Sequence, residues 1–147
     1  MNDGGNAELV MVGDTDPSIR DFAKQLGFKN EVKFKGEIPY RHVASEMQEA
    51  DALILFSNIE NSPCVIGEAL CCGLPVIATS VGGIPELVDQ HNSILVHPEN
   101  EDELVAAMKK MKDGYLAFNK QTIALNAEQR FSYQIIGKKF DDLYRGL

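Results

Sequence analysis

Residues 59–85 read IENSPCVIGEALCCGLPVIATSVGGIP, and the predicted elements of the chain are organised around this segment. It carries two glutamates, Glu60 and Glu68, on either side of a predicted helix start. Ser62 is a favourable N-cap, and Pro63 suits the first helical position, where a missing N–H costs nothing. Glu60 should then lie just outside the helix and Glu68 on its second turn, so that both carboxylates can face the same helix end.

The second half of this stretch repeats the arrangement of strand, loop and helix start. The run 75–78 has the continuous apolar character of a buried strand, and the pair Gly82-Gly83 precedes a second helix start at Pro85. Two successive helix starts would present two sets of free backbone N–H groups with partial positive charge, which suits phosphate. The pattern predicts a site for an anion and a sugar, although a glycine pair can also be a simple tight turn.

Composition sets the frame for this prediction. The 147 residues suit one domain with a real core, and the formal net charge of −8 without a basic cluster argues against nucleic acid as a partner. The N-terminus lacks the pattern of a signal peptide, and the longest apolar region, 64–78, is broken by Glu68, Gly73 and Pro75, which excludes a membrane span. The three cysteines show no disulfide framework, and the cysteines and the three histidines show no metal-binding spacing. We therefore expect no bound metal and a reducing cytoplasm, and we expect the histidines to lie at the surface or in loops.

The rest of the chain alternates predicted strands and helices. Strands are expected at 7–12, 32–34, 52–56 and 93–96, the third of them buried on both faces. Helices are expected from Asp16-Pro17 to Gly27, over 40–50, from a capping box at Asn100 and Glu103 through Met111 with Gly114 as C-cap, over 115–130 and over 132–145. We expect Cys71 and Cys72 to pack a helix against the sheet. We expect the final apolar stripe of Ile136, Phe140, Leu143 and Tyr144 to be mostly core, with part of it exposed if the last helix packs on a domain outside this chain.

This alternation predicts an α/β fold with a doubly wound parallel sheet of Rossmann-like type. Ligands of such sheets bind outside the carboxyl ends of the strands, in the loops that lead into helices. The corresponding loops are 13–16, 36–39, 57–62 and 79–84, which hold the Gly, Ser, Asn and carboxylate residues. The polar chemistry should therefore collect along one edge of the sheet.

Several motifs together carry a resemblance to a known family. The run ENSPCVIGEALCCGLPVIATSVGGIPELV (60–88) resembles the signature of the retaining GT-B glycosyltransferases of glycosyltransferase family 4, glycosyl transferases group 1. The flanking runs agree in order: ELVMVGD (8–14), VKFKGEIP (32–39), ADALILFS (50–57), NSILVHPENEDELVAAM (92–108) and RFSYQIIGKKFDDLY (130–144). The resemblance implies that residues 1–147 form the nucleotide-sugar (donor) binding domain in the C-terminal half of a GT-B enzyme.

The resemblance also implies roles for individual residues. Glu60 would lie beside the donor sugar as the catalytic carboxylate, and Glu68 would accept hydrogen bonds from the ribose hydroxyls. The backbone amides of Cys64 and Val65 would face the sugar and diphosphate. The remaining donor-binding residues implied are Ser62, Pro63, Gly82 and Gly83, with Gly36, Glu37 and Ile38 beside the base. A carboxylate suits a diol and would repel phosphate, which agrees with the role of Glu68.

The chain departs from the family at two points. Asn61-Ser62-Pro63 replaces a common Gly-Phe-Gly, which bears on the choice of donor. An additional first strand and helix, with an Arg and a Lys for the diphosphate, and a preceding acceptor domain with a histidine are not found in the sequence, so we expect an incomplete domain that is inactive by itself. The parent enzyme would transfer a sugar from a nucleoside diphosphate sugar to a sugar, lipid-linked or other acceptor, without a metal or other cofactor. It would work in polysaccharide biosynthesis, in the cytoplasm or peripherally at the inner membrane.

Three alternatives stay open. The same fold could form a non-catalytic module that binds nucleotides or nucleotide sugars. The related GT-B epimerases are a further enzyme class, with different motifs around the glutamate pair. A flavodoxin-like receiver domain is disfavoured, because only Asp14 and Asp16 lie near the end of the first strand and a receiver needs an acidic cluster there.

Overall fold

The computed structural model describes residues 7–14, 16–28 and 31–146. They form two compact units, Met1–Val43 and Ala44–Leu147, each with its own parallel sheet. In chain order the elements are β1 (Leu9–Val12), α1 (Pro17–Gln25), β2 (Val32–Gly36), α2 (Tyr40–Glu49), β3 (Leu53–Leu55), α3 (Cys64–Cys71), β4 (Val76–Thr79), α4 (Ile84–Leu87), β5 (Ser93–Val96), α5 (Glu101–Gly114), a 3-10 turn (Tyr115–Ala117), α6 (Lys120–Phe131) and α7 (Tyr133–Arg145).

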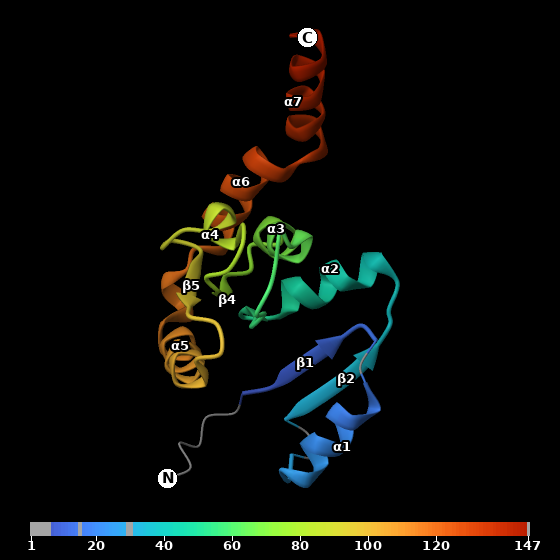
Figure 1. Cartoon of the computed structure of the whole chain (residues 1–147), viewed down its shortest axis with the longest axis vertical. Coiled ribbons are helices and arrows are strands. Elements are labelled where there is room, and N and C mark those ends of the chain that lie inside the picture. The colour runs from blue at the N-terminus through green and yellow to red at the C-terminus, as the bar shows by residue number, and fades with distance from the viewer. Residues whose placement is uncertain (1–6, 15, 29–30, 147) are drawn as a thin grey trace. The chain divides into compact units, whose positions relative to one another are not determined.

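The N-terminal unit pairs β1 with β2 in parallel, with α1 as the connection (Figure 1). The predicted start of α1 is confirmed, because the Asp16 carboxylate accepts a hydrogen bond from the Ser18 N–H at 2.8 Å. The helix ends where Gly27 takes a left-handed φ of 85°, a conformation that glycine adopts without steric cost. The Asp16 and Gly27 signals therefore set both ends of this helix.

The C-terminal unit has a three-stranded parallel sheet in the order β3-β4-β5. Every residue of the central strand β4 is buried, as predicted. Burial of β3 on both faces was also predicted, and this is wrong: all three of its residues are only partly buried. The reason is that β3 is an edge strand of this sheet and β4 is its centre.

Helices cover the C-terminal sheet. Ile77 of β4 packs with Val96, Ala107 and Met111 into a core cluster under α5. Side chains alternate between the two faces along a strand, so the neighbours of Ile77 in β4 point to the other face. α3 contacts β4, and α6 packs against α3. This α/β arrangement with parallel strands confirms the predicted fold class.

Gly73 sets the turn between α3 and β4. Its φ is 75°, and a Cβ at this position would lie 2.6 Å from the backbone oxygen of Lys120 on α6. No other residue type fits both demands without a shift of the backbone. The close approach of this turn to α6 therefore depends on glycine.

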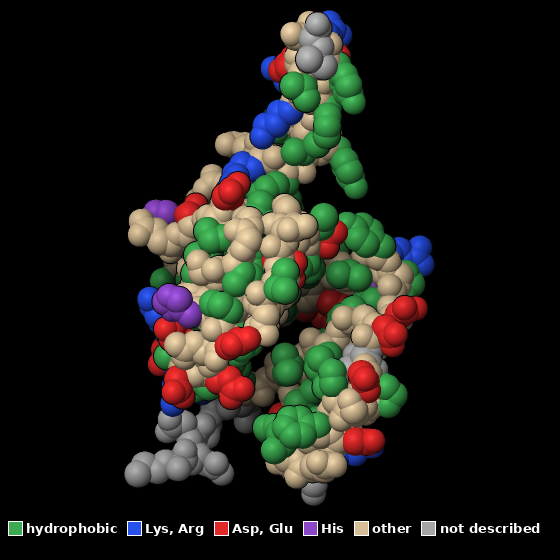
Figure 2. Space-filling view, in the orientation of Figure 1, with side chains coloured by type: hydrophobic (Ala, Val, Ile, Leu, Met, Phe, Trp, Pro, Cys, Tyr) green, Lys and Arg blue, Asp and Glu red, His purple; other side chains and the backbone are tan. Residues whose placement is uncertain are grey.

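The C-terminal elements differ from prediction at three points. α5 continues to Gly114 and passes into a 3-10 turn, so Gly114 is not its C-cap. α6 begins only at Lys120, where Asn119 caps it by accepting a hydrogen bond from the Thr122 N–H at 2.9 Å. The stripe on α7 is not core: Figure 2 shows uncovered hydrophobic side chains along this helix, and Phe140, Leu143 and Tyr144 are exposed. α7 packs mainly against α6, and this contact leaves most of the apolar stripe uncovered.

Across the part of the chain that the structure describes, no helix is both long and apolar enough to span a lipid bilayer.

Candidate functional site

The loops that follow β3 and β4 are bonded to each other at the carboxyl edge of the C-terminal sheet. The Thr79 hydroxyl, at the end of β4, donates to the backbone oxygen of Ser57 at 2.6 Å. Further along, the Gly83 N–H donates to the backbone oxygen of Asn61 at 2.8 Å. Two loops that lie about twenty residues apart in the sequence thus form one surface at the position where such sheets bind ligands.

Gly82 and Gly83 are required by this approach of the two loops. A Cβ at Gly82 would overlap the backbone oxygen of Glu60, and a Cβ at Gly83 would overlap that of Asn61, both well inside 3.0 Å. Gly82 also has a left-handed φ of 52°. The glycine pair is therefore more than a tight turn, because it lets the β4 loop lie directly against the backbone of Glu60.

Glu60 is partly buried, and its side chain is held. The Ser57 hydroxyl donates a hydrogen bond to the Glu60 carboxylate oxygen Oε1 at 2.9 Å. The neighbouring Ile59 side chain is 88% exposed and turns away into solvent. The loop thus keeps a carboxylate at the sheet edge while an apolar residue next to it stays outside.

The start of α3 differs by one residue from prediction. Pro63 is the N-cap, with an extended ψ of 115°, and the helix begins at Cys64, so Ser62 is not the cap and Pro63 is not the first helical residue. No side chain caps this end. The first-turn N–H groups of a helix have no intrahelical partner, and those of Cys64 and Val65 therefore open the helix as donors for an anion.

The second helix start does not offer the free N–H groups that were predicted. α4 has a single turn, and its donors are used within the loop: Gly83 N–H bonds to Asn61, Ile84 N–H to Val81 and Glu86 N–H to Gly83. Pro85 has no N–H. This part of the prediction is wrong, because the Gly83 N–H joins the two loops and the Ile84 and Glu86 N–H groups bond within their own loop.

Glu68 lies on the second turn of α3, as predicted, and it is partly buried. Its carboxylate lies close enough to Cys72 to act on that thiol: burial raises the pKa of Cys72, and the negative charge of Glu68 raises it further. Burial also raises the pKa of Cys71, with the charges of Cys72 and Glu128 adding to it. The predicted packing of these cysteines between helix and sheet is wrong, because Cys71 is exposed and Cys72 only partly buried.

The predicted base-binding residues belong to the N-terminal unit. Gly36 ends β2 with a left-handed φ of 66°, Glu37 is exposed and Ile38 is partly buried in the loop before α2. The backbone oxygen of Gly36 accepts a hydrogen bond from the Gly13 N–H at 2.8 Å. The role of these residues toward a base stays a prediction.

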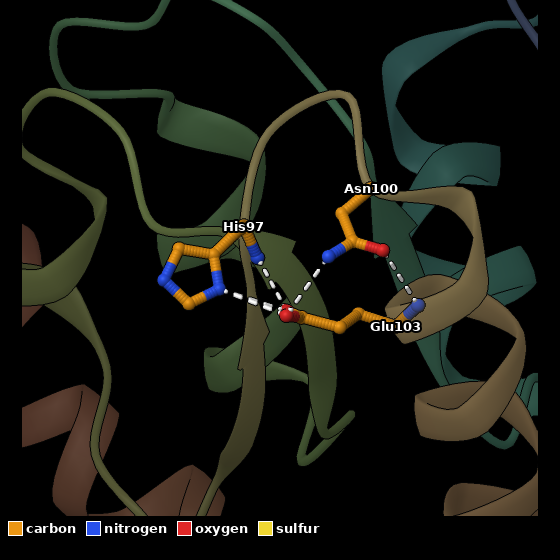
Figure 3. A network of polar contacts seen from close by, with 3 residues as sticks. All are labelled: His97, Asn100 and Glu103. Atoms are coloured by element: carbon orange, nitrogen blue, oxygen red, sulfur yellow. Dashed lines mark hydrogen bonds and ion pairs between the residues drawn. The ribbon is translucent and has the colours of Figure 1, made fainter.

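The loop after β5 forms a polar cluster around Glu103 (Figure 3). The predicted cap is confirmed, since Asn100 accepts from the Glu103 N–H at 3.1 Å and its own amide donates to Glu103 at 2.9 Å. The Glu103 carboxylate also accepts from the His97 N–H at 2.9 Å and lies 3.0 Å from His97 Nδ1. The contacts with His97, that of its backbone N–H first, hold the pKa of Glu103 below its usual value. The sequence reading treated His97 as a surface or loop residue and missed its contact with Glu103.

Sequence reasoning also missed Ser57 and Thr79. Both stand where a predicted strand ends, which is the signal that could have marked them. Within the described ranges, no three His, Cys, Asp or Glu side chains are grouped as metal ligands would be.

The family model for glycosyl transferases group 1 matches residues 1–130. The chain belongs to this glycosyltransferase family. The predicted resemblance to glycosyl transferases group 1 is therefore confirmed. The match covers every residue of the glycosyltransferase chain that was predicted to bind the donor.

Two curated relatives align with most of this glycosyltransferase domain. An uncharacterized glycosyltransferase of Methanocaldococcus jannaschii is 27% identical over 95% of this chain and 37% of its own length. The putative colanic acid biosynthesis glycosyltransferase WcaL of Escherichia coli is also 27% identical, over 95% of this chain and 37% of its own length. The chain thus spans a little over a third of the length of these relatives.

Solved structures agree with the fold. Anabaena HepE in complex with UDP has a TM-score of 0.81 and 28% identity, over 96% of this chain and 41% of HepE. HepE in complex with UDP-glucose has a TM-score of 0.75 and the same 28% identity, over 95% of this chain and 41% of HepE. Sucrose-phosphate synthase from Thermosynechococcus elongatus has a TM-score of 0.84 and 24% identity, over 95% of this chain and 38% of the synthase. At this identity the likeness shows the fold alone. The GT-B type of fold predicted for this glycosyltransferase domain is confirmed.

Proposed function

We propose that this chain is the donor-binding part of a retaining glycosyltransferase that transfers a sugar from a nucleoside diphosphate sugar. Glu60 faces the donor sugar, the N–H groups of Cys64 and Val65 face the diphosphate, and Glu68 accepts hydrogen bonds from the ribose hydroxyls. Ser62, Pro63, Gly82 and Gly83 shape the loops of this site. Gly36, Glu37 and Ile38 lie near the base.

One observation carries the proposal: the loop after β4 lies directly against the backbone of Glu60. The contact needs Gly82 and Gly83, and it supports a held carboxylate four residues before the uncapped start of α3 in the sequence. A carboxylate accepts hydrogen bonds from sugar hydroxyls, and an uncapped helix start donates to phosphate. The two kinds of group match the two ends of a nucleoside diphosphate sugar.

The position of Glu68 supports its proposed role. It lies one turn further along α3 than the first free N–H groups, so its charge stays away from the phosphate position at the helix start. A carboxylate is suited to a pair of ribose hydroxyls, because it accepts hydrogen bonds and a diol donates them. The UDP complex of HepE, a structure similar to this chain, favours a nucleoside diphosphate as the ligand.

Catalysis in this proposal depends on electrostatic stabilisation of the departing diphosphate by helix N–H groups and basic side chains, with no metal. We propose that the basic side chains and the acceptor site come from outside these 147 residues. We therefore expect no transfer by the 147-residue chain alone. A place in polysaccharide biosynthesis is part of the same proposal, and the similarity to WcaL, a putative colanic acid biosynthesis glycosyltransferase, supports it. The proposal also includes a location in the cytoplasm or peripherally at the inner membrane.

Ligand-observed NMR tests the proposal directly. The chain is mixed with UDP, GDP and ADP and with one sugar derivative of each, and saturation transfer to the ribose protons is recorded. We expect ribose contacts with one base, and their loss in Glu68→Ala. Asp113→Ala is the matched control, because Asp113 is an exposed acid on α5, the helix over the other face of the sheet, and it should leave binding intact.

Failure of every nucleotide to bind, or equal binding by Glu68→Ala, would contradict the assigned site. The alternative of a non-catalytic nucleotide-sugar binding module is separated in the whole protein. An enzyme loses transfer when Glu60 is changed to Gln, whereas a binding module has no transfer to lose.

A further inference from the structure

The Glu60 side chain is fixed by a chain of contacts that begins in the core of the sheet. The Thr79 side chain is 0% exposed, and its hydroxyl donates to the Ser57 backbone oxygen at 2.6 Å. The Ser57 hydroxyl in turn donates to Glu60 Oε1 at 2.9 Å. The end of the buried central strand is thus joined through Ser57 to the carboxylate.

The backbone of the same glutamate is fixed from the other side. Gly82 lies against the Glu60 carbonyl without room for a Cβ, and the next residue, Gly83, donates to the Asn61 oxygen at 2.8 Å. With the backbone held, the remaining freedom of Glu60 is that of its side-chain torsions. The Ser57 hydrogen bond restricts those torsions before any ligand arrives.

We propose that Ser57 is a positioning residue, which holds the Glu60 carboxylate in the orientation that binds the donor sugar. This inference rests on the proposed function. Because the Ser57 hydroxyl occupies Oε1, Oε2 is left to accept a hydrogen bond from a sugar hydroxyl. Thr79 acts one step further back, through the backbone of Ser57.

A surface serine that only stabilises a turn would leave a different signature. Loss of a turn contact lowers the melting temperature and affects all ligands alike. Loss of a positioning contact weakens the nucleotide sugar and spares the nucleoside diphosphate, because the diphosphate has no group that reaches Glu60. The ratio of the two dissociation constants, sugar derivative over diphosphate, therefore reports on positioning.

The experiment measures this ratio by calorimetry or NMR titration for UDP-glucose against UDP, GDP-mannose against GDP and ADP-glucose against ADP. The pair that the wild-type chain binds is then used with the variants. We expect Ser57→Ala to raise the ratio by about 3- to 10-fold, the loss of one hydrogen bond to a charged group, and Glu60→Gln to raise it as well. Ser57→Thr keeps the hydroxyl and should restore the ratio to within about twofold of wild type.

Two further variants complete the design. Thr79→Val keeps the volume of the buried side chain and removes the hydroxyl, so it should raise the ratio less than Ser57→Ala does and provides a second route if Ser57→Ala does not fold. Ser45→Ala is the control, since Ser45 is an exposed serine on α2. Melting temperatures are recorded for all variants.

The outcomes separate the inference from the proposed function. An unchanged ratio in Ser57→Ala, together with a raised ratio in Glu60→Gln, would overturn the positioning role and leave the donor site in place. An equal fall in affinity for both ligands of the pair would assign Ser57 a structural role only. If the wild-type chain binds none of the pairs, or Glu60→Gln binds like wild type, the proposed function and this inference both fall.

Discussion

Replacing Gly82 by alanine tests the contact on which the site depends. The added Cβ would overlap the Glu60 carbonyl oxygen, far inside the 3.0 Å that real Cβ atoms keep, and the φ of 52° is a conformation that alanine resists. The left-handed backbone costs about 1–2 kcal/mol and the overpacking about 1–3 kcal/mol. Because both obstacles are backbone and cannot rotate away, we expect Gly82→Ala to destabilise the chain by about 2–5 kcal/mol.

Gly67→Ala is the matched control for this measurement. Gly67 lies inside α3 with an ordinary φ, and a Cβ there would lie 3.6 Å from the Phe131 ring, an ordinary van der Waals contact. Alanine is favoured over glycine in a helix interior by about 0.5–1 kcal/mol, so Gly67→Ala should melt at a higher temperature than wild type.

Thermal unfolding followed by circular dichroism is sufficient as the assay. For a chain of this length, about 3 kcal/mol corresponds to a fall in Tm of roughly 10 °C. A Gly82→Ala protein that melts within about 2 °C of wild type, while Gly67→Ala is stabilised, would refute the close approach of the β4 loop to Glu60.

Two further predictions follow from the shifted pKa values. The pKa of Glu103 is lowered in the folded chain, so the stability that its carboxylate contributes is present above the ordinary value of 4.5 and is lost as the pH falls through the folded pKa. Glu103→Gln should therefore lower the Tm at pH 7 and match wild type near about pH 2, as a series of melting curves would show; a constant difference at every pH would contradict the role of the charge. The pKa values of Cys71 and Cys72 are raised, so both thiols should react more slowly with iodoacetamide than glutathione does near neutral pH, and faster as the pH rises. Mass spectrometry of the labelled peptides measures this, and rates above that of glutathione would be inconsistent with the raised values.

Local signals were sufficient for most of the fold. Three features were predicted from a few neighbouring residues each, and the structure confirms them: the Asp16 cap, the Asn100–Glu103 capping box and the strand 93–96. The apolar run at the centre of the sheet was also recognised, because a strand buried on both faces has a continuous apolar sequence. Local chemistry and tertiary packing agree at these positions.

The errors lie where distant contacts decide. Burial of α7 could not be read from its apolar stripe, because periodicity shows which face is apolar but not whether another element covers it. The glycine pair was predicted to precede a phosphate-binding helix start, while the Gly83 N–H is bonded to Asn61 on another loop. Ser57 and Thr79 were missed for the same reason, since their hydrogen bond joins residues 22 positions apart.

The two glutamates of the site are held by different parts of the molecule. Glu60 depends on the end of β4, because Thr79 bonds to Ser57, Ser57 bonds to the Glu60 carboxylate, and Gly82 lies against the Glu60 backbone. Glu68 is held by α3 and by the packing of that helix against α6. If Glu60 binds the sugar and Glu68 the ribose, substitutions at the end of β4 should alter which sugar is bound. Substitutions of residues in the contact between α3 and α6 should instead alter the affinity for the nucleotide. The two glutamates are eight positions apart in the sequence, so the start of α3 lies between them. In this arrangement the contacts at the end of β4 hold one glutamate, and α3 with α6 holds the other.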